Sequence, residues 1–84
     1  MNEEMIARGQ NAERVLETNE FKQLVDDVRR DVFEQFVKTN VGDAKIREEL
    51  HGIVYSLDLL LLKANKYAND YKFELTREDR TPEA

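Results

Sequence analysis

The feature that most constrains this chain is a seven-residue repeat of apolar positions in its second half. The repeat alternates spacings of four and three residues, and its members are Ile46, Leu50, Ile53, Leu57, Leu60, Ala64, Tyr67 and Tyr71. That spacing places all eight side chains on one face of an α-helix. We therefore predict a helix from Ala44 to roughly Asp70, whose apolar seam is about 39 Å long at ~1.5 Å rise per residue.

Length and composition restrict what the seam can belong to. Eighty-four residues make one domain at most, and a monomer of this size is only marginally stable. The chain has no cysteine, so neither a disulfide framework nor a thiolate metal site reinforces it. Charged residues make up 37% and hydrophobic residues 40%, but the hydrophobic ones are ordered along the chain. This pattern favours a folded central region over disorder.

Two further helices are predicted upstream of the seam. The apolar stripe of the second predicted helix, residues 19–38, consists of Phe21, Val25, Val28, Val32 and Phe36, widened by Leu24, Phe33 and Val37. A shorter helix starts at about Gln10, where Ala12, Val15 and Leu16 share a face. Either Thr18 or Asn19 supplies the cap between these helices.

Residues 39–43 separate the second and third predicted helices. In this turn Gly42 or Asn40 can adopt a positive φ, and Asp43 is expected to cap the following helix. So short a connection makes the flanking helices antiparallel neighbours. The predicted fold is all-α: an antiparallel hairpin of long second and third helices, a short N-terminal helix and a flexible C-terminal tail. The expected divisions are a weakly ordered lead-in at 1–9, the hairpin domain at 10–72 and a polar tail at 73–84.

The third predicted helix also carries apolar residues away from its seam. Tyr55, Leu59 and Leu62 follow one another at spacings of four and three, toward the opposite face of the helix. A helix that is apolar on two faces must be covered on both. Either the short first helix covers these three residues, or another subunit or a partner protein does. They are the predicted protein interface.

The sequence offers no arrangement of residues suited to catalysis. His51 is the only histidine, and scattered carboxylates around it do not make a metal site. Ser56 has no histidine at a relay position, and no glycine-rich phosphate loop is present. We therefore expect no enzyme activity, no metal and no cofactor. Asp27, Asp31 and Glu34 align on one helix face, which is either a solvated outer face or an acidic contact surface.

Charge and hydropathy exclude two further classes of partner. The net charge is −5, from 13 basic and 18 acidic residues, and no basic block stands out. A nucleic-acid partner is not expected, because such proteins carry a positive surface. The longest strictly apolar run, at 59–62, is too short to cross a bilayer, and the acidic N-terminus lacks a signal-peptide layout. No membrane association is expected.

Several segments, taken in order, resemble a group of small helical-hairpin proteins of tailed bacteriophages. The similar segments are Gly-Gln-Asn-Ala-Glu-Arg-Val-Leu at 9–16, Phe21, Gly-Asp-Ala-Lys-Ile-Arg-Glu-Glu-Leu at 42–50, and Ser-Leu-Asp at 56–58. The resemblance covers roughly residues 9–72. The chain departs from the group at residues 18–19, where a proline would follow the first helix. The group has no settled activity, so the resemblance implies a phage origin and a place in virion assembly but no functional residues.

Two hypotheses follow for the function. The first is a non-enzymatic structural or assembly protein of a bacteriophage, which self-associates or docks on a larger phage complex through Tyr55, Leu59 and Leu62. The second is a small acidic phage effector that binds and inhibits a host enzyme or defence complex through Asp27, Asp31 and Glu34. Under either hypothesis the partner is a protein, and the chain acts in the host cytoplasm or in the virion.

Overall fold

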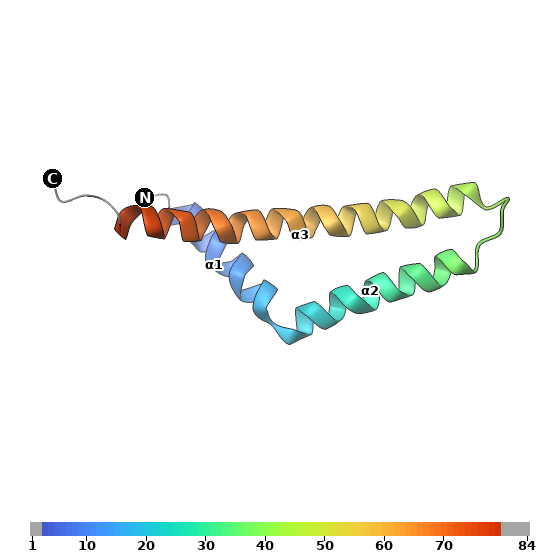
Figure 1. Ribbon diagram of the computed structural model, residues 1–84, viewed down its shortest axis with the longest axis horizontal. Helices are drawn as coiled ribbons and strands as arrows, with labels where there is room; N and C mark the ends of the chain where they lie inside the picture. The colour runs from blue at the N-terminus through green and yellow to red at the C-terminus, as the bar shows by residue number, and fades with distance from the viewer. Residues whose placement is uncertain (1–2, 80–84) are drawn as a thin grey trace.

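The computed structural model describes residues 3–79, which form three α-helices and no strand. They are α1 (Glu3–Glu17), α2 (Asn19–Val37) and α3 (Ala44–Asp79) (Figure 1). The all-α class predicted from the sequence is confirmed. The two breaks between helices also fall where they were predicted, at Thr18 and at residues 38–43.

Helix α2 begins with a side-chain cap and ends close to its predicted limit. The Thr18 hydroxyl accepts a hydrogen bond from the backbone amide of Phe21 at 3.2 Å, so Thr18 rather than Asn19 is the N-cap. At the other end Lys38 is the C-cap, and its amide donates to the carbonyl oxygen of Gln35 at 3.2 Å. The same hydroxyl donates to the carbonyl oxygen of Val15 at 2.8 Å, so it bonds both the last turn of α1 and the first unpaired amides of α2.

The turn between α2 and α3 differs in detail from the sequence-based expectation. No residue in the described part of the chain has a positive φ, so neither Gly42 nor Asn40 uses that conformation. Asp43 holds the N-cap position of α3, since its carbonyl oxygen accepts from the Arg47 amide at 3.0 Å, but its carboxylate accepts a hydrogen bond from the Asn40 amide at 2.8 Å and so closes the turn. On the other side the Arg47 guanidinium donates to the carbonyl oxygen of Val41 at 2.9 Å.

Helix α1 begins earlier than the predicted Gln10. Glu3 and Glu4 lie in its first turn, where negative charge suits the helix dipole, and Met5 and Ile6 are half-buried. Gly9 falls in the predicted lead-in at 1–9, yet it lies inside the helix and is buried. A Cβ added at Gly9 would collide with the Tyr71 side chain and lie 2.8 Å from the carbonyl oxygen of Tyr67. The glycine therefore permits close approach of two helices.

Helix α3 continues nine residues past the predicted end near Asp70. No glycine or proline interrupts residues 53–81, so nothing in that stretch stops a helix. The Thr76 hydroxyl donates to the carbonyl oxygen of Lys72 at 2.9 Å within this extension. Of the predicted polar tail at 73–84, residues 73–79 are thus helical, whereas 80–84 lie outside the described residues.

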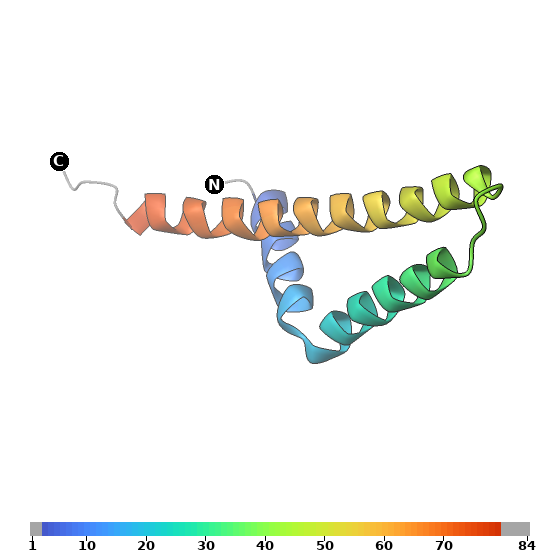
Figure 2. The same ribbon diagram turned by 45° about the vertical axis from the view of Figure 1, so that its right-hand side comes forward.

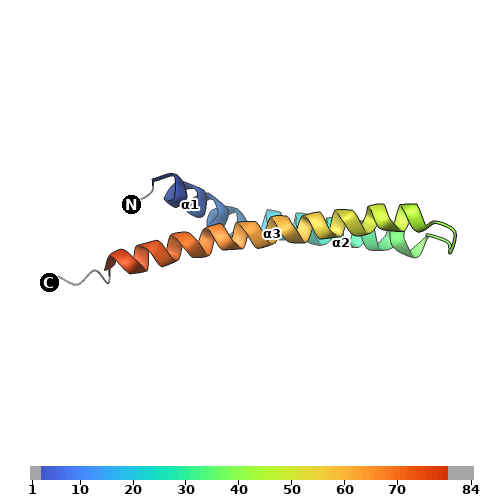
Figure 3. The same cartoon turned by 90° about the horizontal axis from the view of Figure 1, so that it is seen from above.

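The three helices enclose an open, three-sided outline. Helix α2 runs antiparallel to α3 as the hairpin prediction requires, and it slopes away from α3 with distance from the turn (Figures 1 and 2). The N-terminal part of α1 crosses α3 toward the C-terminal end of α3. The view from above shows these two helices at an angle (Figure 3). The predicted hairpin with an N-terminal helix folded over its far end is confirmed.

Polar and aromatic contacts accompany the crossing of α1 and α3. The Arg8 guanidinium lies 4.0 Å from the centre of the Tyr67 ring, a cation–π arrangement. The Gln10 amide donates to the Tyr71 hydroxyl at 3.4 Å. Lys72 lies 3.9 Å from the Glu13 carboxylate. Together with buried Gly9, these contacts make the crossing the most closely packed part of the described chain.

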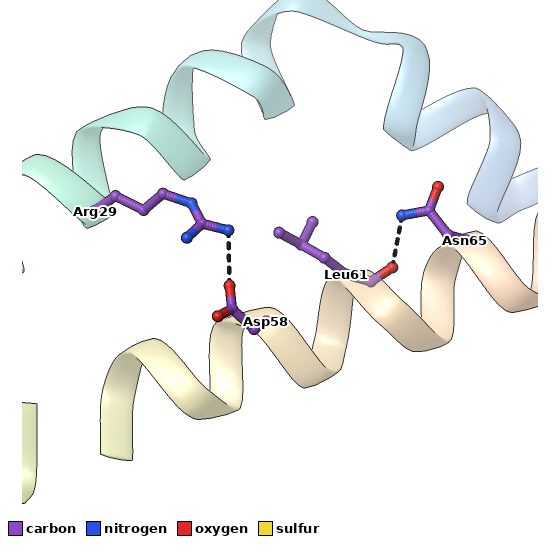
Figure 4. Close-up of polar contacts among 4 residues, drawn as sticks. All are labelled: Arg29, Asp58, Leu61 and Asn65. Carbon is purple, nitrogen blue, oxygen red and sulfur yellow. Dashed lines mark hydrogen bonds and ion pairs between the residues drawn. The ribbon is translucent and has the colours of Figure 1, made fainter. Parts of the chain in front are cut away.

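Among the described residues, one ion pair joins α2 to α3. The Arg29 guanidinium of α2 donates to the Asp58 carboxylate of α3 at 2.8 Å (Figure 4). One turn further along α3 the Leu61 side chain points into the space between the helices, and the Asn65 amide donates to the Leu61 carbonyl oxygen at 2.8 Å. Long side chains thus connect α2 to α3 where the backbones are apart.

Candidate protein-interaction surface

The predicted apolar seam of α3 is only partly covered. Seven buried or half-buried apolar side chains of α3 follow a heptad pattern of their own: Leu50, Val54, Leu57, Leu61, Ala64, Ala68 and Tyr71. Tyr67 of the predicted seam is half-buried as well. This covered stripe shares four positions with the predicted seam, but its remaining members lie one residue further along the chain. Ile46, Ile53 and Leu60 of the predicted seam are 49%, 47% and 57% exposed. Part of the predicted seam is therefore uncovered, because α2 approaches α3 from the side of Val54 and Leu61, while α1 crosses α3 further along, at Tyr67 and Tyr71.

We call Ile46, Ile53 and Leu60 the open stripe. Its three members are seven residues apart, so they lie nearly in line along α3, with a drift of about 20° per heptad. The fourth position of the series, Tyr67, is half-buried beneath Arg8 of α1. The open stripe therefore begins near the hairpin turn and runs up to α1.

An apolar groove adjoins the open stripe at its C-terminal end. Its volume is about 650 Å³, and all three helices contribute to its lining: Asn11, Ala12, Val15, Phe21, Ser56, Leu59, Leu60, Lys63, Ala64 and Tyr67. Only Lys63 in this set bears a charge. A concave, largely apolar surface with a few polar groups is the usual form of a binding site.

The predicted interface residues Tyr55, Leu59 and Leu62 are all exposed, at 64%, 41% and 64%. Helix α1 does not cover them, because it crosses α3 further along, at Tyr67 and Tyr71. Leu59 lies at the edge of the apolar groove, whereas Tyr55 and Leu62 are not among the residues that line it. The first of the two alternatives, cover by the short first helix, is therefore wrong for this structure.

A second apolar area lies at the turn end of the hairpin. Phe33, Phe36 and Val37 of α2 are exposed, and Val41 of the turn is the most exposed large apolar residue of the described chain. A groove of about 340 Å³ adjoins it, lined by Arg29, Val32, Phe33, Phe36, Leu50, His51 and Val54. Sequence reasoning assigned the two phenylalanines to the packed stripe of the second helix. The spacing of apolar residues does not by itself show that both remain exposed.

The acidic residues Asp27, Asp31 and Glu34 lie exposed on the outer face of α2, as their spacing predicts. Two of the three carboxylates bind side chains of their own helix. The Gln23 amide donates to Asp27 at 2.8 Å and the Gln35 amide donates to Asp31 at 3.1 Å. Arg30 lies 3.6 Å from Asp27. These neighbours weaken the negative field that a charged partner would recognise.

The described residues contain no cluster suited to metal binding. No group of three or more histidine, cysteine, aspartate or glutamate side chains converges within residues 3–79. His51 is exposed and lies beside the groove at the turn end of the hairpin. None of the three helices contains, within these residues, a segment long and apolar enough to cross a lipid bilayer.

The chain was compared with protein families, with curated proteins and with solved structures. No family model, no curated protein and no solved structure matches the chain. What the fold and the surface define is an open all-α protein whose longest helix bears exposed apolar side chains on two faces.

Proposed function

We propose that this chain is a non-enzymatic protein–protein interaction protein that self-associates or docks on a larger complex through α3. One observation carries the proposal: the apolar side chains of the monomer are largely uncovered. Among the described hydrophobic residues only Val32, Leu50 and Ala68 are buried, while fourteen large hydrophobic residues are exposed. So small a core gives little of the burial that stabilises a folded domain.

The overall dimensions support the same proposal. The radius of gyration is 18.5 Å, whereas a compact domain of this length has about 12 Å. The accessible surface is 6861 Å², about 1,700 Å² more than a compact protein of this mass exposes. A protein interface of standard size covers about 800 Å² on each partner. The uncovered surface is therefore large enough for binding to one or two protein faces.

A protein partner fits the surface better than the other classes of partner. The net charge of −5 disfavours the backbone of a nucleic acid. Charges of both signs, such as Lys63 and Lys66 beside Asp58 and Asp70, flank the exposed apolar residues of α3. An apolar centre with a charged rim is the usual anatomy of a protein interface.

The resemblance to proteins of tailed bacteriophages adds a setting to the proposal, namely virion assembly in the host cytoplasm or in the virion itself. The alternative, inhibition of a host enzyme through Asp27, Asp31 and Glu34, has less support because glutamine and arginine side chains of α2 already engage two of these carboxylates. Mass spectrometry of purified virions tests the setting, since an assembly protein retained in the particle will be found there.

The interaction itself is tested by dye binding and thermal unfolding across protein concentrations. We expect an environment-sensitive apolar dye to bind the dilute protein, and Tyr55→Gln with Leu62→Gln to reduce that binding. Lys22→Gln, at an exposed polar position of α2 away from these residues, is the control and should leave dye binding unchanged. A protein that unfolds cooperatively at every concentration and binds no dye would contradict the proposal.

A further inference from the structure

The open stripe of α3 has the period of a helix-binding surface. On one side of Leu50, Leu57, Ala64 and Tyr71 lie the other members of the covered stripe, Val54, Leu61 and Ala68. On the other side lies the open stripe. The first side packs on α2. On the second side Ile46, Ile53 and Leu60 are about half exposed, and α1 lies near the C-terminal end, across the groove from Leu60 and over Tyr67. A seven-residue apolar repeat is the spacing with which one α-helix packs along another, as in a coiled coil. The missing partner of the open stripe is therefore a helix that runs along α3.

Two opposite charges lie beside the open stripe. Glu49, Ser56 and Lys63 are also seven residues apart, and they run parallel to Ile46, Ile53 and Leu60. Glu49 and Lys63 are exposed, and neither forms an ion pair with any described residue. Ser56 lies midway between them. The line thus has a negative charge at one end, a neutral residue in the middle and a positive charge at the other end. Two such lines placed antiparallel bring opposite charges together at both ends.

We propose, building on the proposed function, that the partner helix is α3 of a second copy of this chain, bound antiparallel with a twofold axis near Ser56. This register places Glu49 of each copy against Lys63 of the other. It also brings Ile53 of each copy to within one residue of Leu60 of the other. A parallel pair in register would bring each charge near its own equivalent, where repulsion opposes association.

The same register fills the apolar groove. Leu60 and Lys63 line the groove, and the second copy brings Ile53 close to Leu60 and Glu49 opposite Lys63. Each copy therefore inserts the turn-proximal part of its open stripe into the groove of the other and receives the same segment in return. Such an isologous contact closes after two copies and does not propagate into a fibre.

Charge exchange tests the register. Glu49→Lys and Lys63→Glu should each weaken the dimer about tenfold or more, because two attractive pairs become repulsive. The double variant carrying both changes should recover the affinity of the unchanged chain to within about threefold. Glu48→Lys makes the same charge change one position away from the stripe and should leave the affinity unaltered. Sedimentation equilibrium at moderate ionic strength measures all four.

Cysteine cross-linking tests the direction of pairing. The chain has no cysteine, so single cysteines report unambiguously. Ser56→Cys, next to the axis, should join two copies through a short bis-maleimide. Asp70 lies seven residues beyond Lys63 on the same line. Asp70→Cys should not cross-link, because the register puts the two cysteines about 40 Å apart at ~1.5 Å per residue. Efficient cross-linking at both positions would mean a parallel pair and overturn the proposal.

The remaining outcomes separate this pairing from the broader proposed function. A chain that stays monomeric at high concentration but binds dye overturns the self-pairing and leaves docking on a different protein in place. A monomer that binds no dye and unfolds cooperatively overturns both. A dimer whose affinity is unchanged by both single charge reversals overturns the register through Ser56.

Discussion

Helix α3 packs against α1 and against α2 in two different ways. At the α1 crossing small residues, Gly9 and Ala68, are buried and the backbones come close. Along α2 the helices separate with distance from the turn, and the long Arg29 side chain reaches Asp58 across the gap. How closely these helices pack therefore depends more on the size of the residues at the contact than on the number of apolar residues. The α2–α3 pair has the larger supply of apolar side chains and the looser fit.

The largest effect is expected where the α2–α3 pair is most closely packed. Val32 and Leu50 are buried and line the same groove near the turn. Leu50→Ala should lower the free energy of unfolding by about 3 kcal/mol, since it removes buried methyl groups and leaves a cavity. Chemical denaturation at one fixed protein concentration measures it. Leu24→Ala, at an exposed position of α2, should cost under about 0.5 kcal/mol; equal losses would mean that the hairpin has no defined core.

The next largest effect should come from the α1–α3 crossing. Gly9→Ala adds a Cβ that collides with Tyr71, and overpacking of this kind costs about 2 kcal/mol. Thermal unfolding followed by circular dichroism measures the loss. Gly52→Ala is the matched control, because a Cβ there meets nothing within 4 Å. In an exposed helix interior that change should stabilise the chain by up to ~1 kcal/mol. If both substitutions stabilise, α1 does not pack on α3 through Gly9.

A smaller effect is expected at the joint between α1 and α2. Thr18→Ala removes the hydroxyl that caps α2 and should cost about 1 kcal/mol. Asn19→Ala should be nearly neutral, since Asn19 is the first residue of the helix rather than its cap. Urea unfolding of both variants checks the assignment. A greater loss for the Asn19 variant would shift the start of α2 by one residue.

The smallest effect belongs to the bridge across the hairpin. A double-mutant cycle on Arg29→Ala and Asp58→Ala should give a coupling free energy of about 0.5 kcal/mol, because both side chains are substantially exposed. The coupling should weaken as salt is raised. A coupling several times larger, insensitive to salt, would mean that α2 and α3 are held more tightly than their slope suggests.

The sequence was sufficient for the class of fold, because helix breaks depend on local chemistry. Thr18 and the turn at 39–43 act on neighbouring backbone groups, so their effect can be read without knowing the tertiary structure. Gly9 could not be read in this way. A Cβ at Gly9 would point at Tyr71, which is sixty-two residues away in the chain. The spacing of residues in the sequence does not show that these two residues come together.

The sequence predicted which face of α3 is covered only approximately: three of the predicted positions differ by one residue from those of the covered stripe. The predicted seam and the observed covered stripe have the same heptad spacing and share Leu50, Leu57, Ala64 and Tyr71. Val54 and Leu61 are as apolar as Ile53 and Leu60, so hydropathy does not distinguish the two sides. The choice is made by the direction from which α2 approaches α3. For the same reason Tyr55, Leu59 and Leu62 could be placed on a separate face, but their lack of cover could not be derived from sequence.

The three-sided outline has a mechanical consequence. Rods joined at three corners form a truss, whose angles are fixed by the lengths of its sides rather than by the material between them. Here the short sides are α1 and α2, of 15 and 19 residues, or about 22 and 28 Å. A single turn inserted into either would shift Gly9 along α3 away from Tyr71 and change every angle. Outward-facing substitutions leave the side lengths unaltered, so this molecule should tolerate many exchanged side chains and very few insertions within its helices.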